Sequence, residues 1–370
     1  MSSEGGRIGR SLKRICWLLI GIAIAIYLIF FVPKAALPHV PERGYVDMHV
    51  HAAGLGYGGS GAYVHPDLVD SWKFPIYLRA FDISEAELHE EGDRVLLKKL
   101  SQKIANSLFI DQAVVLAMDG AVDERGELDL HRTQLYVPNE YLISELENYP
   151  NLLFGASVNP LRHDSLERLD QVVENGAVLI KWLPNIMHFS PSDERIEPFY
   201  RRMVEHCIPL LTHTGAEHSF NYADNSLGDP FRLHLPLSLG VTVIAAHIAT
   251  TGETDGEAHF ERLIPMFEDY PNLYADISSL TQINKIGYLR QALKIESVTE
   301  RLLYGTDWPL QFFPLVSPYY LLDTVSLKQA NTARRLDNLW DRDTVMKKFA
   351  GVPEEVFLRF PELIASTCGS

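Results

Sequence analysis

Several kinds of residue are scarce in this 370-residue sequence, and each scarcity excludes a class of protein. The three cysteines, Cys16, Cys207 and Cys368, lie far apart and fit neither a zinc ribbon nor a disulfide framework. Basic residues are scarce beyond the N-terminus. The first 43 residues hold six of the 33 Lys and Arg but only two of the 48 Asp and Glu, which leaves a net charge of −19 for residues 44–370. A domain this acidic is a poor candidate for binding nucleic acid or anionic lipid.

The glycine-rich phosphate-binding turn of a dinucleotide-binding fold is also missing. Its G-x-G-x-x-G motif would follow the first strand and open a helix. Glycines do follow the first apolar run, at positions 54, 56, 58, 59 and 61, but they have neither this spacing nor a helical pattern after them. This absence argues against an open, doubly wound sheet.

A long hydrophobic run without charge occurs once, over residues 15–32. At about 1.5 Å per residue it would span about 27 Å as a helix, close to the thickness of a bilayer's hydrocarbon core. More basic residues precede this run than follow it, which places the N-terminus in the cytoplasm. A cleaved signal peptide is the alternative, but the run is longer than usual and no clean small-residue cleavage site follows it. We therefore expect an uncleaved, single-pass membrane anchor, with the rest of the chain on the extracytoplasmic (periplasmic) side.

These observations divide the chain into four parts. Residues 1–14 form a basic cytoplasmic N-terminus, residues 15–32 the anchor, and residues 33–43 a stiff stalk with three prolines. Residues 44–370 form the folded domain, which has ample apolar material for a large core.

The folded domain contains eight short apolar runs separated by longer helical patterns. Most runs are continuously apolar, as expected of parallel strands buried on both faces. Eight strand-then-helix units in about 320 residues are what a (β/α)8 barrel requires. The runs are residues 45–51, 112–118, 153–159, 177–184, 209–215, 242–248, 272–279 and 301–309.

The loop over residues 52–83 is unusually long and contains large aromatic residues, among them Tyr57, Tyr63, Trp72 and Phe74. We expect it to form a mobile cover over the barrel mouth, although it could also merely decorate the surface. Residues 311–320, after the eighth run, are also strongly aromatic and suggest an apolar pocket wall. Packing of these aromatics against outer helices is an equal alternative.

Metal-capable side chains stand at the carboxyl-terminal ends of five predicted strands, where the active sites of such barrels lie. In an extended strand, residues i and i+2 share a face, so the side chains of His49 and His51 point to the same side and form a clamp that could hold one metal ion. Each residue alone has a structural explanation: a lysine can reach the surface, a histidine can be hydrogen-bonded in the core, and an aspartate can cap a helix. Five strand ends together favour a site. The residues are His49 and His51, Lys181, His213, His247 and Asp307.

The chemistry of this set points to hydrolysis. Neutral imidazoles with one carboxylate suit zinc or a similar ion, which lowers the pKa of bound water to about 7. A carboxylate beside that water can take its proton and pass it to a leaving group. The set therefore suits attack on a polarised carbonyl.

The sequence resembles the amidohydrolase superfamily, within it the amidohydrolase-related branch of metal-dependent hydrolases and decarboxylases. The resemblance extends from about residue 45 to residue 349, and the residues that carry it are Asp47 to His51, Gly176 to Lys181, Pro209 to Gly215, His247, Asn272 to Asp276 and Gly305 to Pro309. It implies an α/β fold, a distorted (β/α)8 TIM barrel, here preceded by a single transmembrane helix. One or two divalent metal ions, most simply zinc, would lie at its mouth.

The resemblance also implies roles for the site residues. His49, His51 and His213 would be metal ligands, and Asp307 would be both a ligand and the acceptor of the water's proton. In members with two metals, a carboxylated lysine at the position of Lys181 bridges the ions and the histidine at the position of His247 is a ligand. In members with one metal, His247 would instead orient water or substrate, and Lys181 would contact an anionic substrate.

Three functions remain open from the sequence. The first is a membrane-anchored hydrolase of an amide, lactone or ester bond in a small molecule. The second is a non-oxidative decarboxylase of a small carboxylic acid, with Asp307 as proton donor. The third is a catalytically inactive barrel that acts as a membrane-tethered binding module. Glu217 and His218, just beyond His213, could reach the substrate or could be structural.

Overall fold

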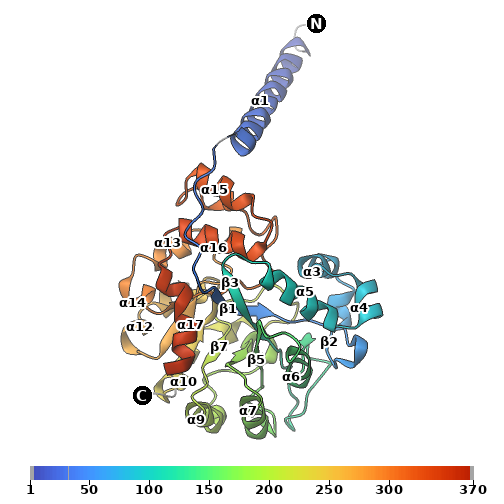
Figure 1. Cartoon of the computed structure of the whole chain (residues 1–370), viewed down its shortest axis with the longest axis vertical. Coiled ribbons are helices and arrows are strands. Elements are labelled where there is room, and N and C mark those ends of the chain that lie inside the picture. Colours follow the sequence, from blue (N-terminus) through green and yellow to red (C-terminus); the bar gives the residue numbers. More distant parts are fainter. Residues whose placement is uncertain (1–3, 32, 367–370) are drawn as a thin grey trace.

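The computed structural model describes residues 4–31 and 33–366. Its centre is one sheet of eight parallel strands, with helices arranged around it (Figure 1). The strands follow one another in chain order: β1 (Tyr45–His51), β3 (Ile110–Leu116), β5 (Leu152–Ala156), β6 (Leu179–Trp182), β7 (Leu210–Thr212), β8 (Val243–Ala245), β11 (Leu273–Asp276) and β12 (Leu302–Leu303).

The sheet closes between its first and last strands. The backbone N–H of His51 donates to the carbonyl of Trp308 at 2.9 Å, and that of Asp307 donates to the carbonyl of His49 at 3.0 Å. Val50 and Trp308 form a parallel bridge. The result is a nearly closed parallel barrel, consistent with the (β/α)8 architecture expected from the sequence.

The strands are shorter than the apolar runs that predicted them. The run over residues 242–248 yields a strand of only Val243–Ala245, because His247, Ile248 and the next residue, Ala249, have positive φ angles of 50–58° that no strand permits. Asp307, just beyond β12, has a φ of 65°. The chain thus leaves the sheet at the positions where the metal-capable side chains stand.

Helices surround the barrel, and the last of them packs side chains into its interior. The outer helices include α6 (Asn139–Leu146), α7 (Ser165–Glu174), α9 (Glu197–Glu205), α11 (His259–Leu263), α12 (Met266–Asp269), α13 (Tyr288–Ala292), α14 (Glu296–Thr299), α15 (Leu327–Arg334) and α16 (Leu339–Phe349). Phe360 and Leu363 of α17 (Glu354–Ser366) pack with Val46 and Met48, inside the barrel. Burial of such side chains contributes about 1.5–3 kcal/mol each, so α17 is part of the barrel's core rather than an appendage.

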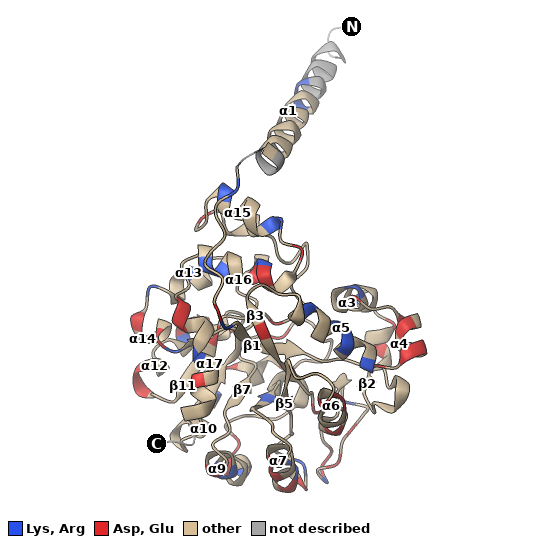
Figure 2. Ribbon diagram, in the orientation of Figure 1, with Lys and Arg blue, Asp and Glu red and all other residues tan. Residues whose placement is uncertain are grey.

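Charge on the outer helices follows the acidic composition. Acidic residues lie on helices such as α4 (Glu85–Glu91) and α7, whereas α5 (Arg94–Ala105) carries Lys and Arg (Figure 2). Helix α4 begins with a capping box, in which the backbone N–H of Glu87 donates to Ser84 Oγ and that of Ser84 donates to Glu87 Oε2. Gly92 ends this helix with a φ of 80°, so the apolar pattern after Ser84 forms two helices rather than one.

The segment between β1 and α4 is folded. It contains η1 (Tyr57–Gly59), the short strand β2 (Tyr63–Val64), α2 (Pro66–Val69) and α3 (Phe74–Phe81). Strand β2 pairs in antiparallel fashion with β4 (Leu135–Tyr136). We call residues 52–96 the cap, because this segment and the start of α5 lie over one side of the barrel mouth.

The transmembrane anchor expected over residues 15–32 is wrong. Helix α1 (Glu4–Phe31) projects away from the barrel (Figure 1), but no helix in the described part of the chain is long and apolar enough to cross a membrane. Residues 1–3 and 32 lie outside the described residues. The expected single-pass membrane localisation, with the barrel on the periplasmic side, depended on this anchor and is therefore wrong as well.

Candidate metal centre

Two histidines from β1 and one aspartate from beyond β12 meet at the barrel mouth. The nearest contacts are from Asp307 Oδ1 to His51 Nε2, at 3.1 Å, and to His49 Nε2, at 3.6 Å. Each of the three residues offers one ligand atom, and these atoms lie within 4.8 Å of one another. One carboxylate oxygen facing two imidazole nitrogens is an arrangement that a divalent ion can bridge.

An irregularity in β1 brings both histidines to the inner side of the barrel. The pairing of β1 with β3 shifts register between Asp47 and Val50. Met48 belongs to the inner apolar cluster, whereas Val50 belongs to the outer one between sheet and helices. Such bulges re-aim side chains next to active sites, so the simple alternation that suggested the clamp is only part of the explanation.

Close packing around His49 explains the glycine at position 305. A Cβ atom on Gly305 would lie 2.8 Å from the Cβ of His49 and 3.3 Å from that of Ser278. Contacts below 3.0 Å require something to move. Only glycine therefore allows the end of β12 to approach β1 closely enough for Asp307 to face both histidines.

Lys181, which would bridge two metals or contact an anionic substrate, is fully buried on β6. It is two residues after Leu179, which packs in the inner cluster, so alternation directs it to the barrel interior. Its Nζ lies 3.1 Å from His49 Nε2. Burial lowers the pKa of Lys181 to about 8, because a charged ammonium is costly where water is excluded.

His213 and His247 complete the set of candidate ligands. The His213 ring stands 5.4 Å from the His247 ring, and the His247 ring stacks on that of His49 at 5.2 Å. Within the described chain, His213 Nε2 is buried and has no hydrogen-bond partner. A buried imidazole nitrogen without a partner is costly, and a metal ion would satisfy it.

The protonation states of these groups suit metal binding. Burial lowers the pKa of His49 and of His213 to about 4, so both rings are neutral at pH 7 and keep a lone pair for a ligand. Burial alone would raise the pKa of Asp307, but the neighbouring imidazoles of His247, His51 and His49 hold it well below its usual range. The site thus offers neutral nitrogens and one ionised carboxylate.

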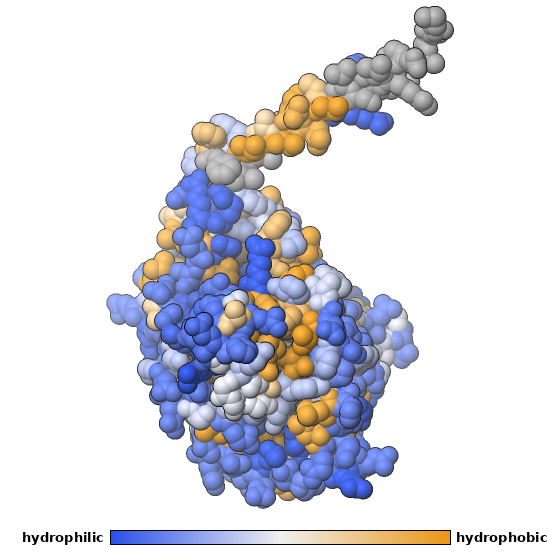
Figure 3. All heavy atoms as spheres, turned by 90° about the vertical axis from the view of Figure 1, so that its right-hand side faces the viewer, coloured by the Kyte–Doolittle hydropathy of each residue, from blue (hydrophilic) through white to orange (hydrophobic). Residues whose placement is uncertain are grey.

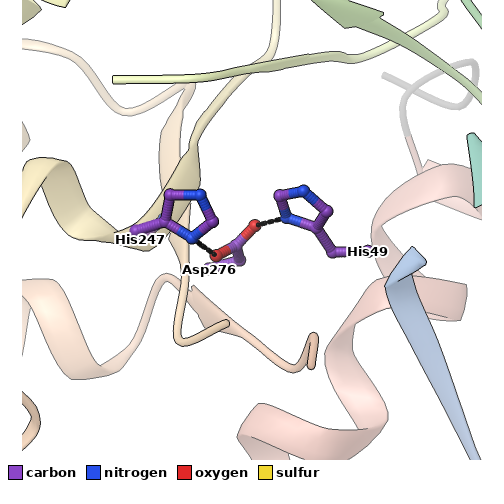
Figure 4. Close-up of side chains that lie close together, drawn as sticks. All are labelled: His49, His247 and Asp276. Atoms are coloured by element: carbon purple, nitrogen blue, oxygen red, sulfur yellow. Dashed lines mark hydrogen bonds and ion pairs between the residues drawn. The ribbon is translucent and has the colours of Figure 1, made fainter. Parts of the chain in front are cut away.

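Asp276, the last residue of β11, joins His49 to His247 (Figure 4). Its Oδ2 lies 2.8 Å from His49 Nδ1, and its Oδ1 accepts from the backbone N–H of His247 at 2.9 Å. Burial would raise the pKa of Asp276, but the His49 ring and the Ser278 hydroxyl lower it. A carboxylate on Nδ1 holds the proton there, so the lone pair of His49 Nε2 faces Asp307 and Lys181.

Sequence reasoning included Asp276 in a family motif but gave it no role. His49, His247 and Asp276 also offer ligand atoms close enough to hold an ion together. However, both Asp276 oxygens are engaged by the His49 ring, Ser278 and the backbone of His247. Orientation of His49 therefore explains Asp276 better than ligation does. The sequence signal that could have identified Asp276 was its position, because it stands near the end of a predicted strand, as the candidate ligands on five other strands do.

Lys285 is a second buried cation at the site, and the sequence gave no signal for it. It lies in η6 (Ile283–Lys285), 6% exposed, and its Nζ donates to Ser279 Oγ. The same hydroxyl lies 3.1 Å from His247 Nδ1. Burial lowers the pKa of Lys285. Glu217, for which the sequence left a substrate contact and a structural role open, has its Oε2 3.8 Å from His213 Nε2.

A large cavity extends from these groups toward the cap, and its space is about 1330 Å³ when the open mouth is counted. The site contributes Lys181, Glu217 and Lys285, together with His51, His213, His247 and Asp307. The cap contributes mostly apolar residues, so the expectation that it covers the mouth agrees with the structure. Of the two alternatives for residues 311–320, the structure does not support the pocket wall: none of these residues, all within the described chain, lines this cavity, and the Phe313 side chain is exposed.

Comparison with known proteins places the chain in a family. A family model described as amidohydrolase matches residues 46–314. A search of curated proteins gave no match. Among solved structures, an uncharacterized TIM-barrel protein from Bordetella bronchiseptica is similar, with a TM-score of 0.53 and 15% identity over 89% of this chain and 100% of that chain. At this identity the likeness concerns the barrel fold alone.

Two further structures are less similar. A protein from Pseudomonas putida assigned as a 2-pyrone-4,6-dicarboxylic acid hydrolase has a TM-score of 0.48 and 14% identity, over 89% of this chain and 99% of that one. A dihydroxybenzoic acid decarboxylase from Polaromonas with bound manganese has a TM-score of 0.47 and 13% identity, over 88% and 97%. The resemblance seen in the sequence is confirmed by the family match, which covers most of the barrel: the chain belongs to the amidohydrolase family.

Proposed function

We propose that the chain is a metal-dependent hydrolase that cleaves an ester, lactone or amide bond of a small molecule. The observation that carries this proposal is the convergence of His49 Nε2, His51 Nε2 and Asp307 Oδ1 at the barrel mouth. These groups are buried or half-buried, and they open into a cavity large enough for a substrate.

The residues present fit a divalent ion. His49, His51 and Asp307 would hold one ion, and His213, His247 and a carboxylated Lys181 would be the ligands of a second ion. The unpartnered Nε2 of His213 supports this assignment. A bound ion polarises a carbonyl and lowers the pKa of water to about 7. Zinc is the simplest choice for a set rich in imidazole.

The chain's own groups would then move protons and position the substrate. In hydrolysis, the oxygen of water bonds to the carbonyl carbon and the bond to the leaving oxygen or nitrogen breaks. Asp307, ionised and next to His51, would accept the proton of that water and deliver it to the leaving group. His247, fixed through Nδ1 by the Ser278 hydroxyl at 2.7 Å, presents Nε2 to the cavity. It would hold the water or the carbonyl oxygen in place.

The test is metal content together with activity. We expect His49→Ala, His213→Ala and Asp307→Asn to lose bound metal, measured by elemental analysis, and hydrolytic activity on ester and amide panels. His206→Ala is a matched control, since His206 pairs with Asp170 away from the site. Full metal content and activity in all three site variants would refute the proposal. Wild-type protein that takes up no metal would favour the inactive binding module instead.

Decarboxylation is the second candidate, and the two buried lysines favour it. Lys181 and Lys285 both line the cavity, where they suit the carboxylate of a substrate. Two metals per chain and a Lys181 heavier by the mass of carbon dioxide in native mass spectrometry would favour hydrolysis. One metal, an unmodified Lys181 and release of carbon dioxide from aromatic acids would favour decarboxylation.

A further inference from the structure

Polar and apolar groups are separated along the large cavity. All charged residues that line it come from the barrel-mouth side: Lys181, Glu217, Lys285 and Asp307. The lining residues between positions 53 and 118 carry no charge, and Tyr77 is the one with a polar side-chain group. They are Ala53, Gly54, Leu55, Val64, Leu68, Phe74, Tyr77, Leu78, Phe81, Ile83, Leu88, Leu96 and Met118.

The spacing of residues on α3 shows how the apolar wall is formed. Phe74, Tyr77, Leu78 and Phe81 line the cavity, at positions i, i+3, i+4 and i+7. This spacing places four side chains on one face of a helix. Ile76, on another face of the same helix, is 36% exposed and does not line the cavity. Helix α3 therefore turns a dedicated apolar face toward the site.

Hydrogen bonds fasten the cap to the loop that follows β7. Lys73 Nζ donates to the carbonyl of His218 at 3.1 Å, and Tyr77 Oη donates to the carbonyl of Ser219 at 2.9 Å. On the cap's other side, Tyr222 donates to Asp67. These contacts use polar atoms at the rim and leave the cavity wall apolar. On the outer face toward which α3 and α4 lie, hydrophobic side chains are exposed among hydrophilic ones (Figure 3).

We infer that the substrate is an amphiphilic carbonyl compound whose acyl part carries an extended apolar chain, bound against the cap with its carbonyl at the metal centre. This inference rests on the proposed function and adds the substrate class. A small polar acid would leave the cap wall in contact with water, and burying each methylene of a chain there raises affinity roughly fourfold.

The first experiment compares p-nitrophenyl esters of acetate, butyrate and octanoate on the zinc-loaded full chain. From acetate to octanoate we expect kcat/KM to rise at least about 100-fold, because several methylenes become buried. A change of less than about threefold, or a fall, would overturn the inference while leaving the proposed function intact.

If the wild-type protein cleaves none of the esters faster than the Asp307→Asn variant does, a binding measurement can still test the substrate class separately from the hydrolase function. That result would count against the proposed function. Calorimetric titration of the same protein with sodium octanoate and sodium acetate then tests the cavity itself. We expect octanoate to bind at least about tenfold more tightly than acetate, and equal affinities would overturn the inference.

A matched pair of variants on α3 locates the effect. Leu78→Asp places a charge on the cavity wall and should lower the ratio of kcat/KM for the octanoate ester to that for the acetate ester at least about tenfold. Ile76→Asp introduces the same change on the other face and should leave this ratio unchanged. If Leu78→Asp does not fold, Leu78→Trp fills the same space and should lower the ratio of octanoate to acetate activity. An unchanged ratio in the variant that folds would contradict the assigned wall.

Discussion

The functional geometry at the residue scale depends on which nitrogen of each histidine is free. His49 has one nitrogen held by Asp276 at 2.8 Å, and the other lies 3.1 Å from Lys181 Nζ and 3.6 Å from Asp307 Oδ1. Without the carboxylate of Asp276, the ring could carry its proton on either nitrogen. Asp276 is thus a positioning residue, which would act on a bound metal ion through His49.

Replacement of Asp276 tests this role. Asp276→Asn can keep the shape of the side chain but can present an N–H to His49 Nδ1, which favours the wrong tautomer. We expect metal affinity to fall about 10–100-fold, measured by competition with a chromophoric chelator. Asp269→Asn, an exposed change on α12, is the control and should leave affinity unchanged. Wild-type affinity in Asp276→Asn would mean that Asp276 has a purely structural role.

The sequence could predict most of the candidate site because strand ends are local features. His49, His51 and Asp307 follow short apolar runs, and the closed barrel brings such ends together without further information. Lys285 could not be found this way. It lies on a 3-10 helix beyond β11, and only the path of that connection turns its side chain back to Ser279.

At the scale of elements, a buried ion pair on α16 supports the end of β12. Lys347 Nζ lies 2.6 Å from Asp343 Oδ2 and donates to the carbonyl of Gly305 at 2.8 Å. Both side chains are almost completely buried. Gly305 is two residues before Asp307, so this pair ties an outer helix to the strand that carries a candidate ligand.

Breaking the pair on one side leaves an uncompensated buried charge. We expect Lys347→Met to lower the free energy of unfolding by about 3–5 kcal/mol, measured by urea denaturation. The double variant Asp343→Leu/Lys347→Met removes both charges and should recover a large part of this loss. If the single and double variants were equally unstable, packing rather than charge would explain the effect.

The elements also show where sequence patterns mislead. The eight apolar runs correctly predicted eight strands, because burial on both faces leaves a continuous pattern. Residues 52–83 of the cap were expected to form a long loop, because α2 and α3 are short and β2 needs the distant strand β4 as its partner. Pairing between segments about 70 residues apart depends on the tertiary structure, so a local sequence pattern cannot predict it.

At the scale of the whole molecule, the segment before β1 touches the barrel domain at few points. The carbonyl of Ala35 accepts from Thr332 Oγ1 at 3.0 Å, and its N–H donates to the carbonyl of Lys328 at 3.3 Å, both on α15. Helix α1 lies beyond this contact and away from the barrel (Figure 1). Residues of the predicted stalk over 33–43 therefore contact the barrel domain through Ala35, whereas α1 lies beyond this contact.

Removal of residues 1–33 tests whether the barrel domain is stable and active without α1. We expect the shortened chain to keep its metal content and activity, with a melting temperature within about 2 °C of the full chain, because less than about 1 kcal/mol of contacts is lost. Calorimetry and elemental analysis measure both. A large loss of stability would show that α1 is part of the folded domain and would place the domain boundary nearer the N-terminus.

Metal binding and folding are linked in the whole chain, because the candidate ligands come from β1, β6 and the segments beyond β7, β8 and β12, which meet only in the closed barrel. An ion that binds the folded state alone stabilises it by about 4 kcal/mol at a concentration 1,000-fold above its dissociation constant. Removal of metal with a chelator should therefore lower the melting temperature of wild type, and added zinc should restore it. The Asp307→Asn variant should melt at one temperature with or without zinc, since its site no longer holds the ion. A zinc response retained in that variant would place the bound metal elsewhere in the molecule.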